Sequence, residues 1–201
     1  MPSPRLLCVY CSSSPHLAPE YYAAAEALGE AMPARGWGLV YGGGKIGLMG
    51  AVARGVKRSG GAVIGVIPHF MKERELEFRE ADELHTVITM AERKAAMIAR
   101  AQAYVALPGG IGTLEELVEQ LTWQQLGRHA KPILIANIAG FWEPLLGLLT
   151  HMRATHFIRP TLAVEILKAE RVEDFLPRLQ AAAAKASEEA KQLAPEVVRR
   201  L

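Results

Sequence analysis

Hydrophobic runs of five or six residues alternate along the chain with longer segments whose apolar positions recur at helical spacing. The short runs are bounded by Gly, Pro or polar residues, which is typical of buried strands. The pattern predicts seven strands, at residues 6–10, 37–41, 62–67, 84–88, 103–107, 132–137 and 164–169. It predicts helices at residues 20–32, 48–59, 89–101, 113–126 and 141–154, and a C-terminal helix at about 174–200.

This alternation of strands and helices predicts an α/β fold, with a doubly wound, mainly parallel sheet and helices on both faces. No internal repeat or linker divides residues 1–201, so we expect a single domain. In such sheets ligands bind at the carboxyl ends of the strands. Two glycine-rich turns follow predicted strands at this edge, at residues 42–47 and 108–112.

The turn at residues 108–112 has the sequence Pro-Gly-Gly-Ile-Gly. Its glycines permit positive φ and close approach of a ligand to the amides. Thr113 and Glu116 have the spacing of a capping box, which places the helix start at Thr113. Free N–H groups and the helix dipole favour a phosphate or carboxylate at such a start. We therefore predict an anion site on the amides of Gly110 to Thr113, with Glu116 about one helical turn away.

The other turn, Gly42-x-Gly44-x-x-Gly47, has the spacing of a dinucleotide fingerprint. Residues 51–71 contain no Asp or Glu that would hold the ribose of NAD, and the sequence has no P-loop motif. These observations disfavour a dinucleotide or a triphosphate. Two anion-binding turns suit a small phosphorylated ligand, with Gly43 and Gly44 as candidate contacts and no cofactor.

Composition narrows the choice of partners. The 201 residues carry a formal charge of +2, with 50% hydrophobic and 22% charged residues, as in ordinary globular proteins. Neither a nucleic-acid footprint nor a membrane span is present in the sequence, and the apolar run at residues 6–11 is too short for a signal peptide. We expect a cytoplasmic protein that binds neither nucleic acid nor membranes.

The two cysteines, Cys8 and Cys11, form a C-x-x-C in the strand-like run at residues 6–11. Residues three apart in a strand point to opposite faces. We therefore interpret both as buried small hydrophobic residues rather than a redox pair. The six histidines are scattered, so no metal site is predicted.

Thr89 and Glu92 form a second capping box, and Arg93 and Lys94 follow in the first turns of that helix. Positive charges there oppose the helix dipole by about 0.3–1 kcal/mol. This cost favours an anion beside Arg93, although a solvated positive face balanced by Glu92 is the alternative.

The charged segment at residues 72–77 is interpreted as a solvated loop, with a lid as the alternative. The polar turn at residues 11–15 is either an ordinary turn or a ligand-facing loop.

Three spaced motifs resemble the LOG (Lonely Guy) family, whose members are cytokinin riboside 5′-monophosphate phosphoribohydrolases long mislabelled as lysine decarboxylases. The motifs are Pro108-Gly109-Gly110-x-Gly112-Thr113-x-x-Glu116, Gly42-Gly43-Gly44-x-x-Gly47-Leu48-Met49-Gly50 and Met90-x-x-Arg93-Lys94. The resemblance covers residues 9 to about 157. It implies a Rossmann-like homodimer that needs no cofactor. Such an enzyme hydrolyses the N-glycosidic bond of a purine-type (cytokinin riboside or adenosine) 5′-monophosphate to free base and ribose 5-phosphate.

By position, the resemblance implies catalytic roles for Glu116 and Arg93. It implies substrate contacts for Glu75, Lys94, Gly110, Ile111, Gly112, Thr113, Leu114, Glu115 and Thr122. The sequence departs from the family at Ser12, Lys45 and Ala91, where Gly, a small residue and His are common. These departures concern the base preference more than the reaction type.

Two other hypotheses compete with hydrolysis. One is a nucleotide-binding carrier or sensor on the same fold without turnover. The other is a pyridoxal-phosphate decarboxylase, which needs a Schiff-base lysine, for which Lys45 and Lys94 offer little support in so short a chain. From the local sequence alone, Glu116 fits a capping residue as well as a carboxylate that stabilises an oxocarbenium-like transition state.

Overall fold

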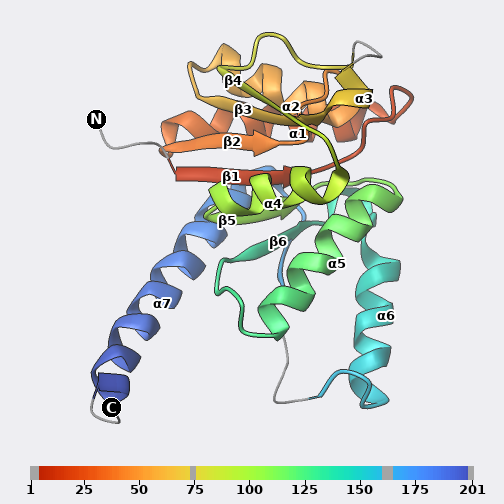
Figure 1. Cartoon of the computed structure of the whole chain (residues 1–201). Coiled ribbons are helices and arrows are strands. Elements are labelled where there is room, and N and C mark those ends of the chain that lie inside the picture. The colour runs from red at the N-terminus through yellow and green to blue at the C-terminus, as the bar shows by residue number, and fades with distance from the viewer. Residues whose placement is uncertain (1–4, 73–75, 160–164, 199–201) are drawn as a thin grey trace.

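A seven-stranded sheet forms the centre of the computed structural model, which describes residues 5–72, 76–159 and 165–198 (Figure 1). Its strand order is β4-β3-β2-β1-β5-β6-β7, and every neighbouring pair is parallel. The strands are β1 (Arg5–Tyr10), β2 (Trp37–Tyr41), β3 (Val63–Pro68), β4 (Glu83–Val87), β5 (Ala103–Ala106), β6 (Ile133–Ala136) and β7 (Leu167–Ala169). All seven predicted strands are confirmed.

The predicted helices are also confirmed, and two short helices add to them. The long ones are α1 (Pro19–Ala34), α2 (Gly47–Arg58), α4 (Met90–Arg100), α5 (Ile111–Gln125), α6 (Glu143–Ala154) and α7 (Val172–Val198). The additional ones are α3 (His69–Lys72) and the 3₁₀ helix η1 (Ile138–Gly140). In Figure 1, α4 and α5 cross one face of the sheet, while α7 extends away from it.

Alternate residues of the central strands pack into separate cores on the two faces of the sheet. Leu7 and Val9 of β1 pack with α1, α2 and α7, whereas Cys8 and Tyr10 pack with α4, α5 and α6. Cys8 and Cys11 are free and buried in opposite cores, as the sequence predicted. Burial raises the pKa of both thiols, which disfavours the reactive thiolate.

The centre of the sheet contains the topological switch point. From β1 the chain builds outward through β2 on one side, and the later strands continue from β5 on the other. The loops that leave β1 and β5 are tied together: the Leu107 N–H donates to the Tyr10 carbonyl at 2.9 Å, and the Ser12 N–H donates to the Pro108 carbonyl at 3.2 Å. In doubly wound folds, ligands bind at this point.

The two predicted capping boxes have different outcomes. The box at α4 is confirmed, because the Glu92 N–H donates to Thr89 Oγ1 at 3.1 Å and the Thr89 N–H donates to Glu92 Oε2 at 3.3 Å. The box at α5 is wrong, because the helix begins at Ile111 with Gly110 as its N-cap and no side-chain cap. The Thr113 side chain instead packs over Gly109, where an added Cβ would lie 2.1 Å from Thr113 Oγ1.

The glycines of the two turns also differ in their backbone conformation. Positive φ occurs at Gly43 and Gly47, with values of 74° and 62°. It does not occur at Gly109, Gly110 or Gly112, contrary to the expectation from the sequence. Gly109 is needed for close packing rather than for a left-handed turn.

Candidate active site

A cavity of about 430 Å³ lies at the carboxyl ends of β1 and β5. Its polar wall comes from the loop at residues 11–14, from Arg93 on α4 and from the first turns of α5. Its apolar wall includes the side chains of Met49, Met71 and Met90. The volume is within the range of small-ligand sites.

The start of α5 presents free backbone donors to this cavity. The first backbone hydrogen bond of the helix runs from the Leu114 N–H to the Gly110 carbonyl at 3.0 Å, so the preceding N–H groups are not used within the helix. Gly110 and Gly112 line the cavity, and a Cβ added to either would have no atom within 4 Å. The absence of side chains therefore keeps the helix start open to an anion.

Glu116 and Arg93 form a buried ion pair beside these amides. Arg93 Nη1 donates to Glu116 Oε1 at 3.2 Å, and the side chains are 5% and 6% exposed. Burial raises the pKa of Glu116 to about 7, although the charge of Arg93 lowers it. A carboxylate in this state exchanges a proton near neutral pH, as a general base requires. Glu116 also lines the cavity, so this carboxylate lies on the wall of the candidate site.

The glycine turn at residues 42–47 helps to hold Arg93 in place. Arg93 Nη2 donates to the Gly42 carbonyl and Nε to the Val66 carbonyl, at 3.2 and 3.1 Å. A Cβ added to Gly42 would lie 1.7 Å from Arg93 Nη2, so a side chain there would displace the guanidinium. Three side-chain hydrogen bonds thus fix the Arg93 guanidinium inside the protein.

The same turn does not offer a second open helix start. The Leu48 N–H of α2 donates to the Ser12 carbonyl at 2.9 Å, so the chain's own backbone occupies this position. The Gly43 carbonyl accepts from the Phe78 N–H, and the Gly44 carbonyl accepts from the Tyr41 hydroxyl. Neither Gly43 nor Gly44 is among the residues that line the cavity.

Lys94 lies at the interface of α4 and α5 rather than free in solvent. Its Nζ donates to Glu119 Oε1 at 3.2 Å and to Glu115 Oε1. These two carboxylates, Glu115 first, raise the pKa of Lys94. Because Glu115 also lines the cavity, this ion pair lies at the cavity edge.

The remaining predicted residues are dispersed. Leu114 packs against the core between α5 and the sheet. Thr122 lies in a groove between α5 and α6, where its Oγ1 donates to the Val118 carbonyl at 2.8 Å. Glu75 lies outside the described residues. Glu77, in contrast, is only 5% exposed and forms a bridge with Gly44, so this end of the charged segment is not the solvated loop that we expected.

Two groups on the wall were not identified as site residues from the sequence. Ser13 and Ser14 belong to the polar turn for which a ligand-facing role was left open. Met49 and Met90 occur in the spaced motifs, but Met71 carried no signal. All three lie in helices, where an apolar side chain usually indicates core packing, so spacing alone could not assign these methionines to a cavity.

Similar proteins identify the group to which this chain belongs. The sequence profile of the family described as "Possible lysine decarboxylase" matches residues 49–179. Cytokinin riboside 5′-monophosphate phosphoribohydrolase LOG1 of Arabidopsis thaliana is 41% identical over 196 residues, which are 94% of this chain and 92% of that protein. The enzyme LOG of Oryza sativa subsp. japonica is 43% identical over 176 residues, which are 88% of this chain and 73% of that protein. The chain belongs to the LOG family.

Solved structures extend the likeness beyond the LOG family. The molybdenum cofactor carrier protein of Chlamydomonas reinhardtii superposes with a TM-score of 0.70 at 20% identity, covering 90% of this chain and 99% of the other. The protein TM1055 gives a TM-score of 0.67 at 21% identity, covering 88% of this chain and 99% of the other. At these identities the likeness establishes a shared Rossmann-like fold.

The described residues were also compared with what a metal site and a membrane-spanning helix require. Across the described residues, no group of three or more His, Cys, Asp or Glu is placed to hold a metal ion. No helix within those residues has the length and apolar character needed to cross a membrane.

Proposed function

We propose that this LOG-family protein hydrolyses the N-glycosidic bond of a purine-type 5′-monophosphate, such as a cytokinin riboside monophosphate or AMP. The products are the free base and ribose 5-phosphate. The observation that carries the proposal is the buried carboxylate of Glu116 on a cavity wall, next to the open start of α5. The named activity of the Arabidopsis and rice relatives supports the same reaction.

The cavity suggests how such a nucleotide would bind. The phosphate would accept hydrogen bonds from the amides of Ile111 to Thr113, where the helix dipole adds favourable charge. The base would pack against Met49 and Met90, whose flexible thioether side chains adapt to planar and branched groups. The ribose would then lie between these two regions, beside Glu116. The resemblance adds Glu75 and Lys94 as candidate contacts.

Hydrolysis needs one water and no other reactant. As the C–N bond breaks, C1′ of the ribose gains positive charge, which the negative charge of Glu116 stabilises. Glu116 accepts a proton from the attacking water, whose oxygen bonds to C1′. The same proton can then pass to the departing nitrogen of the base. Arg93 keeps the carboxylate oriented through its hydrogen bond to Oε1.

A comparison of AMP, adenosine and ATP tests the function. We expect release of adenine from AMP, and at least about tenfold slower release from adenosine and ATP, because the open helix start suits one terminal phosphate. The rate should rise as the pH passes through about 7. Burial raises the pKa of Glu116 to about 7, and this carboxyl must be ionised to act as the general base. Liquid chromatography of the free base provides the measurement. Binding of AMP without base release would support the carrier hypothesis instead.

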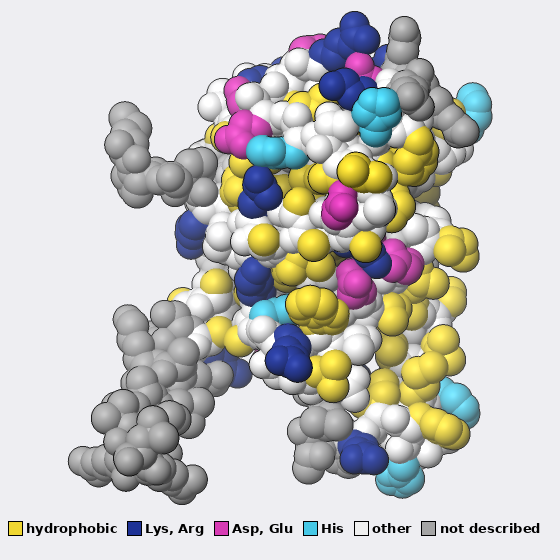
Figure 2. Space-filling view, viewed as in Figure 1, with side chains coloured by type: hydrophobic (Ala, Val, Ile, Leu, Met, Phe, Trp, Pro, Cys, Tyr) yellow, Lys and Arg dark blue, Asp and Glu magenta, His cyan; other side chains and the backbone are white. Residues whose placement is uncertain are grey.

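We also propose that the enzyme is a homodimer that joins through α5 and α6. Hydrophobic side chains gather over these helices in Figure 2, and Val118, Leu126 and Leu148 are 43%, 65% and 49% exposed. A groove of about 180 Å³ between the two helices adds an apolar seat for a second copy. A patch of this kind is common at protein interfaces.

The substitution Leu148→Glu tests this surface. Burying an unpaired carboxylate in an interface is unfavourable, so the variant should sediment as a monomer under conditions in which the parent sediments as a dimer. Sedimentation velocity at several concentrations measures the difference. A variant that remains dimeric would place the interface elsewhere.

A further inference from the structure

Unpaired buried polar atoms gather beneath α5, on the side that faces the sheet. Among the described residues, nine buried side-chain nitrogen or oxygen atoms have no hydrogen-bond partner. Six of these nine belong to one group of five residues, which we call the α5 band: Tyr104, Glu119, Gln120, Gln124 and His129. Buried polar groups nearly always pair with protein or with ordered water. Their concentration in one place therefore indicates a hydrated interior.

Gln120 lies about one helical turn after Glu116 on α5. It is fully buried, and both its Nε2 and its Oε1 lack a partner among the described residues. Gln120 follows Glu116 by four positions and Gln124 follows by four more, so the three side chains lie along one face of the helix. The face that carries Glu116 into the active-site cavity thus continues as a polar stripe.

The sheet side of the band is continuous with the surroundings of Glu116. Burial raises the pKa of Tyr10, and its neighbours Cys8, Tyr104 and, last, Glu116 raise it further. The ring of Tyr10 stacks on that of Tyr104 with centroids 6.0 Å apart, and the Tyr104 ring lies 5.5 Å from that of His129. These contacts connect the catalytic end of α5 to the loop that follows its other end.

The band supplies both donors and acceptors. His129 Nδ1 accepts the Lys131 N–H at 3.2 Å, so in the neutral ring the proton lies on Nε2. Burial and the charge of Lys131 lower the pKa of His129, which keeps the ring neutral at physiological pH. Nε2 of His129 and the Tyr104 hydroxyl therefore donate, while Oε2 of Glu119 and Oε1 of Gln124 accept. Water molecules between them would satisfy both kinds of group.

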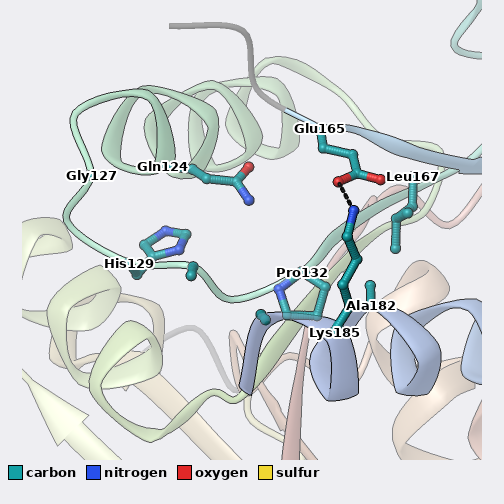
Figure 3. Close-up of a pocket in the computed structure, with 10 residues that line it drawn as sticks. Gln124, Gly127, His129, Pro132, Glu165, Leu167, Ala182 and Lys185 are labelled. Atoms are coloured by element: carbon teal, nitrogen blue, oxygen red, sulfur yellow. Dashed lines mark ion pairs between the residues drawn. The ribbon is translucent and has the colours of Figure 1, made fainter. Parts of the chain in front are cut away.

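A second cavity meets the band at its far end. This cavity, of about 410 Å³, is lined by Gln124 and His129 on one side and by an ion pair of Glu165 and Lys185 on the other (Figure 3). The two charged side chains are 73% and 63% exposed, so the cavity is open to solvent. Water can therefore reach the band from the end of α5 opposite to the active site.

We propose that the α5 band encloses a chain of ordered water that solvates Glu116 from behind, and that Gln120 is the positioning residue that links this water to the carboxylate. The proposal rests on the proposed function in taking Glu116 as the base. The charged and titratable groups that act on Glu116 are Arg93, Lys94, Glu115 and Glu119 from α4 and α5, with Cys8, Tyr10 and Cys11 at β1. Gln120 and its water would add dipoles that favour the ionised carboxylate.

The substitution Gln120→Leu in the full-length chain tests the proposal, because it removes both amide atoms at similar volume. The acidic limb of the pH profile of kcat should move up by about one unit, which lowers kcat at pH 6 about tenfold and leaves it nearly unchanged at pH 9. KM for AMP should stay within about twofold, because Gln120 does not line the active-site cavity. Tyr104→Phe, which removes a single hydroxyl from the band, should shift the limb in the same direction by less.

Gln180→Leu is the matched control, since it makes the same change on α7, which packs on the other face of the sheet, and it should leave the pH profile unchanged. An infrared titration of the Glu116 carboxyl, identified by subtracting the spectrum of Glu116→Gln, reads the same shift without turnover. If the parent does not cleave AMP but the carboxyl titration moves as expected, the proposed function fails and the band survives. If neither Gln120→Leu nor Tyr104→Phe moves the titration, the band is overturned. Tyr104→Phe alone decides the question should Gln120→Leu not fold.

Discussion

Glu116→Gln is expected to lower the turnover of AMP by about 10²–10⁴-fold. Glutamine can still accept a hydrogen bond from Arg93 Nη1, which lies 3.2 Å from Glu116 Oε1 in the parent. It cannot take a proton from water, and it presents no negative charge to the developing cation. AMP should still bind, because the amides at the start of α5 are unchanged. Steady-state kinetics and calorimetric titration with AMP measure the two effects separately.

Glu115→Gln provides the matched control for this prediction. It makes the same chemical change one residue earlier on α5, at a side chain that is 53% exposed and paired with Lys94. Surface ion pairs contribute little to stability, so the fold should persist, and turnover should change by no more than about tenfold. If Glu116→Gln, shown by circular dichroism to be folded, cleaves AMP at nearly the parental rate, Glu116 is not the base.

The strands were predictable because a parallel strand is covered on both faces. Such strands appear in the sequence as continuous apolar runs, and Leu39 of β2 and Ile135 of β6 are fully buried accordingly. The short helices α3 and η1 carry too few residues to show a period. β7 spans Leu167–Ala169, so residues 165 and 166 of the predicted strand lie outside it, because the pairing with β6 involves only these three residues; residue 164 lies outside the described residues.

The sequence also indicated that Arg93 meets an anion, and the structure identifies one as Glu116. The capping box at α5 was misread because Thr-x-x-Glu describes local geometry only. Glu116 accepts from Arg93, 23 residues earlier in the chain, and this partner lies beyond the reach of any local pattern. Strand order was equally hidden. The adjacency of β1 and β5 brings Ser13 and Ser14 to the cavity, and that adjacency follows from tertiary packing.

Arg93→Ala is expected to destabilise the fold by about 3–5 kcal/mol, because it leaves Glu116 as a buried carboxylate without its partner. Arg93 is buried and also satisfies the Gly42 and Val66 carbonyls, which would lose their donors. For a chain of this size the loss corresponds to a decrease in Tm of roughly 6–20 °C. Urea and thermal unfolding followed by circular dichroism measure it.

The stability that Arg93→Ala loses should depend on pH, and the titration of Glu116 sets the direction of this dependence. The charge of Arg93 lowers the pKa of Glu116, so its removal should raise that pKa further above the ordinary value of 4.5. A folded-state pKa above the unfolded value favours the folded protein at low pH, and this stability is lost as the pH rises through the folded pKa. Arg93→Ala should therefore lose more stability, relative to the parent, at pH 8.5 than at pH 5.5. The double variant Arg93→Ala/Glu116→Gln lacks the titrating carboxylate. At pH 5.5 Glu116 of the single variant is protonated and therefore neutral, like glutamine. The free energies of unfolding of the single and double variants should thus differ less at pH 5.5 than at pH 8.5. A loss that is equal at both pH values for the single variant would mean that Arg93 stabilises the fold through its carbonyl contacts rather than through Glu116.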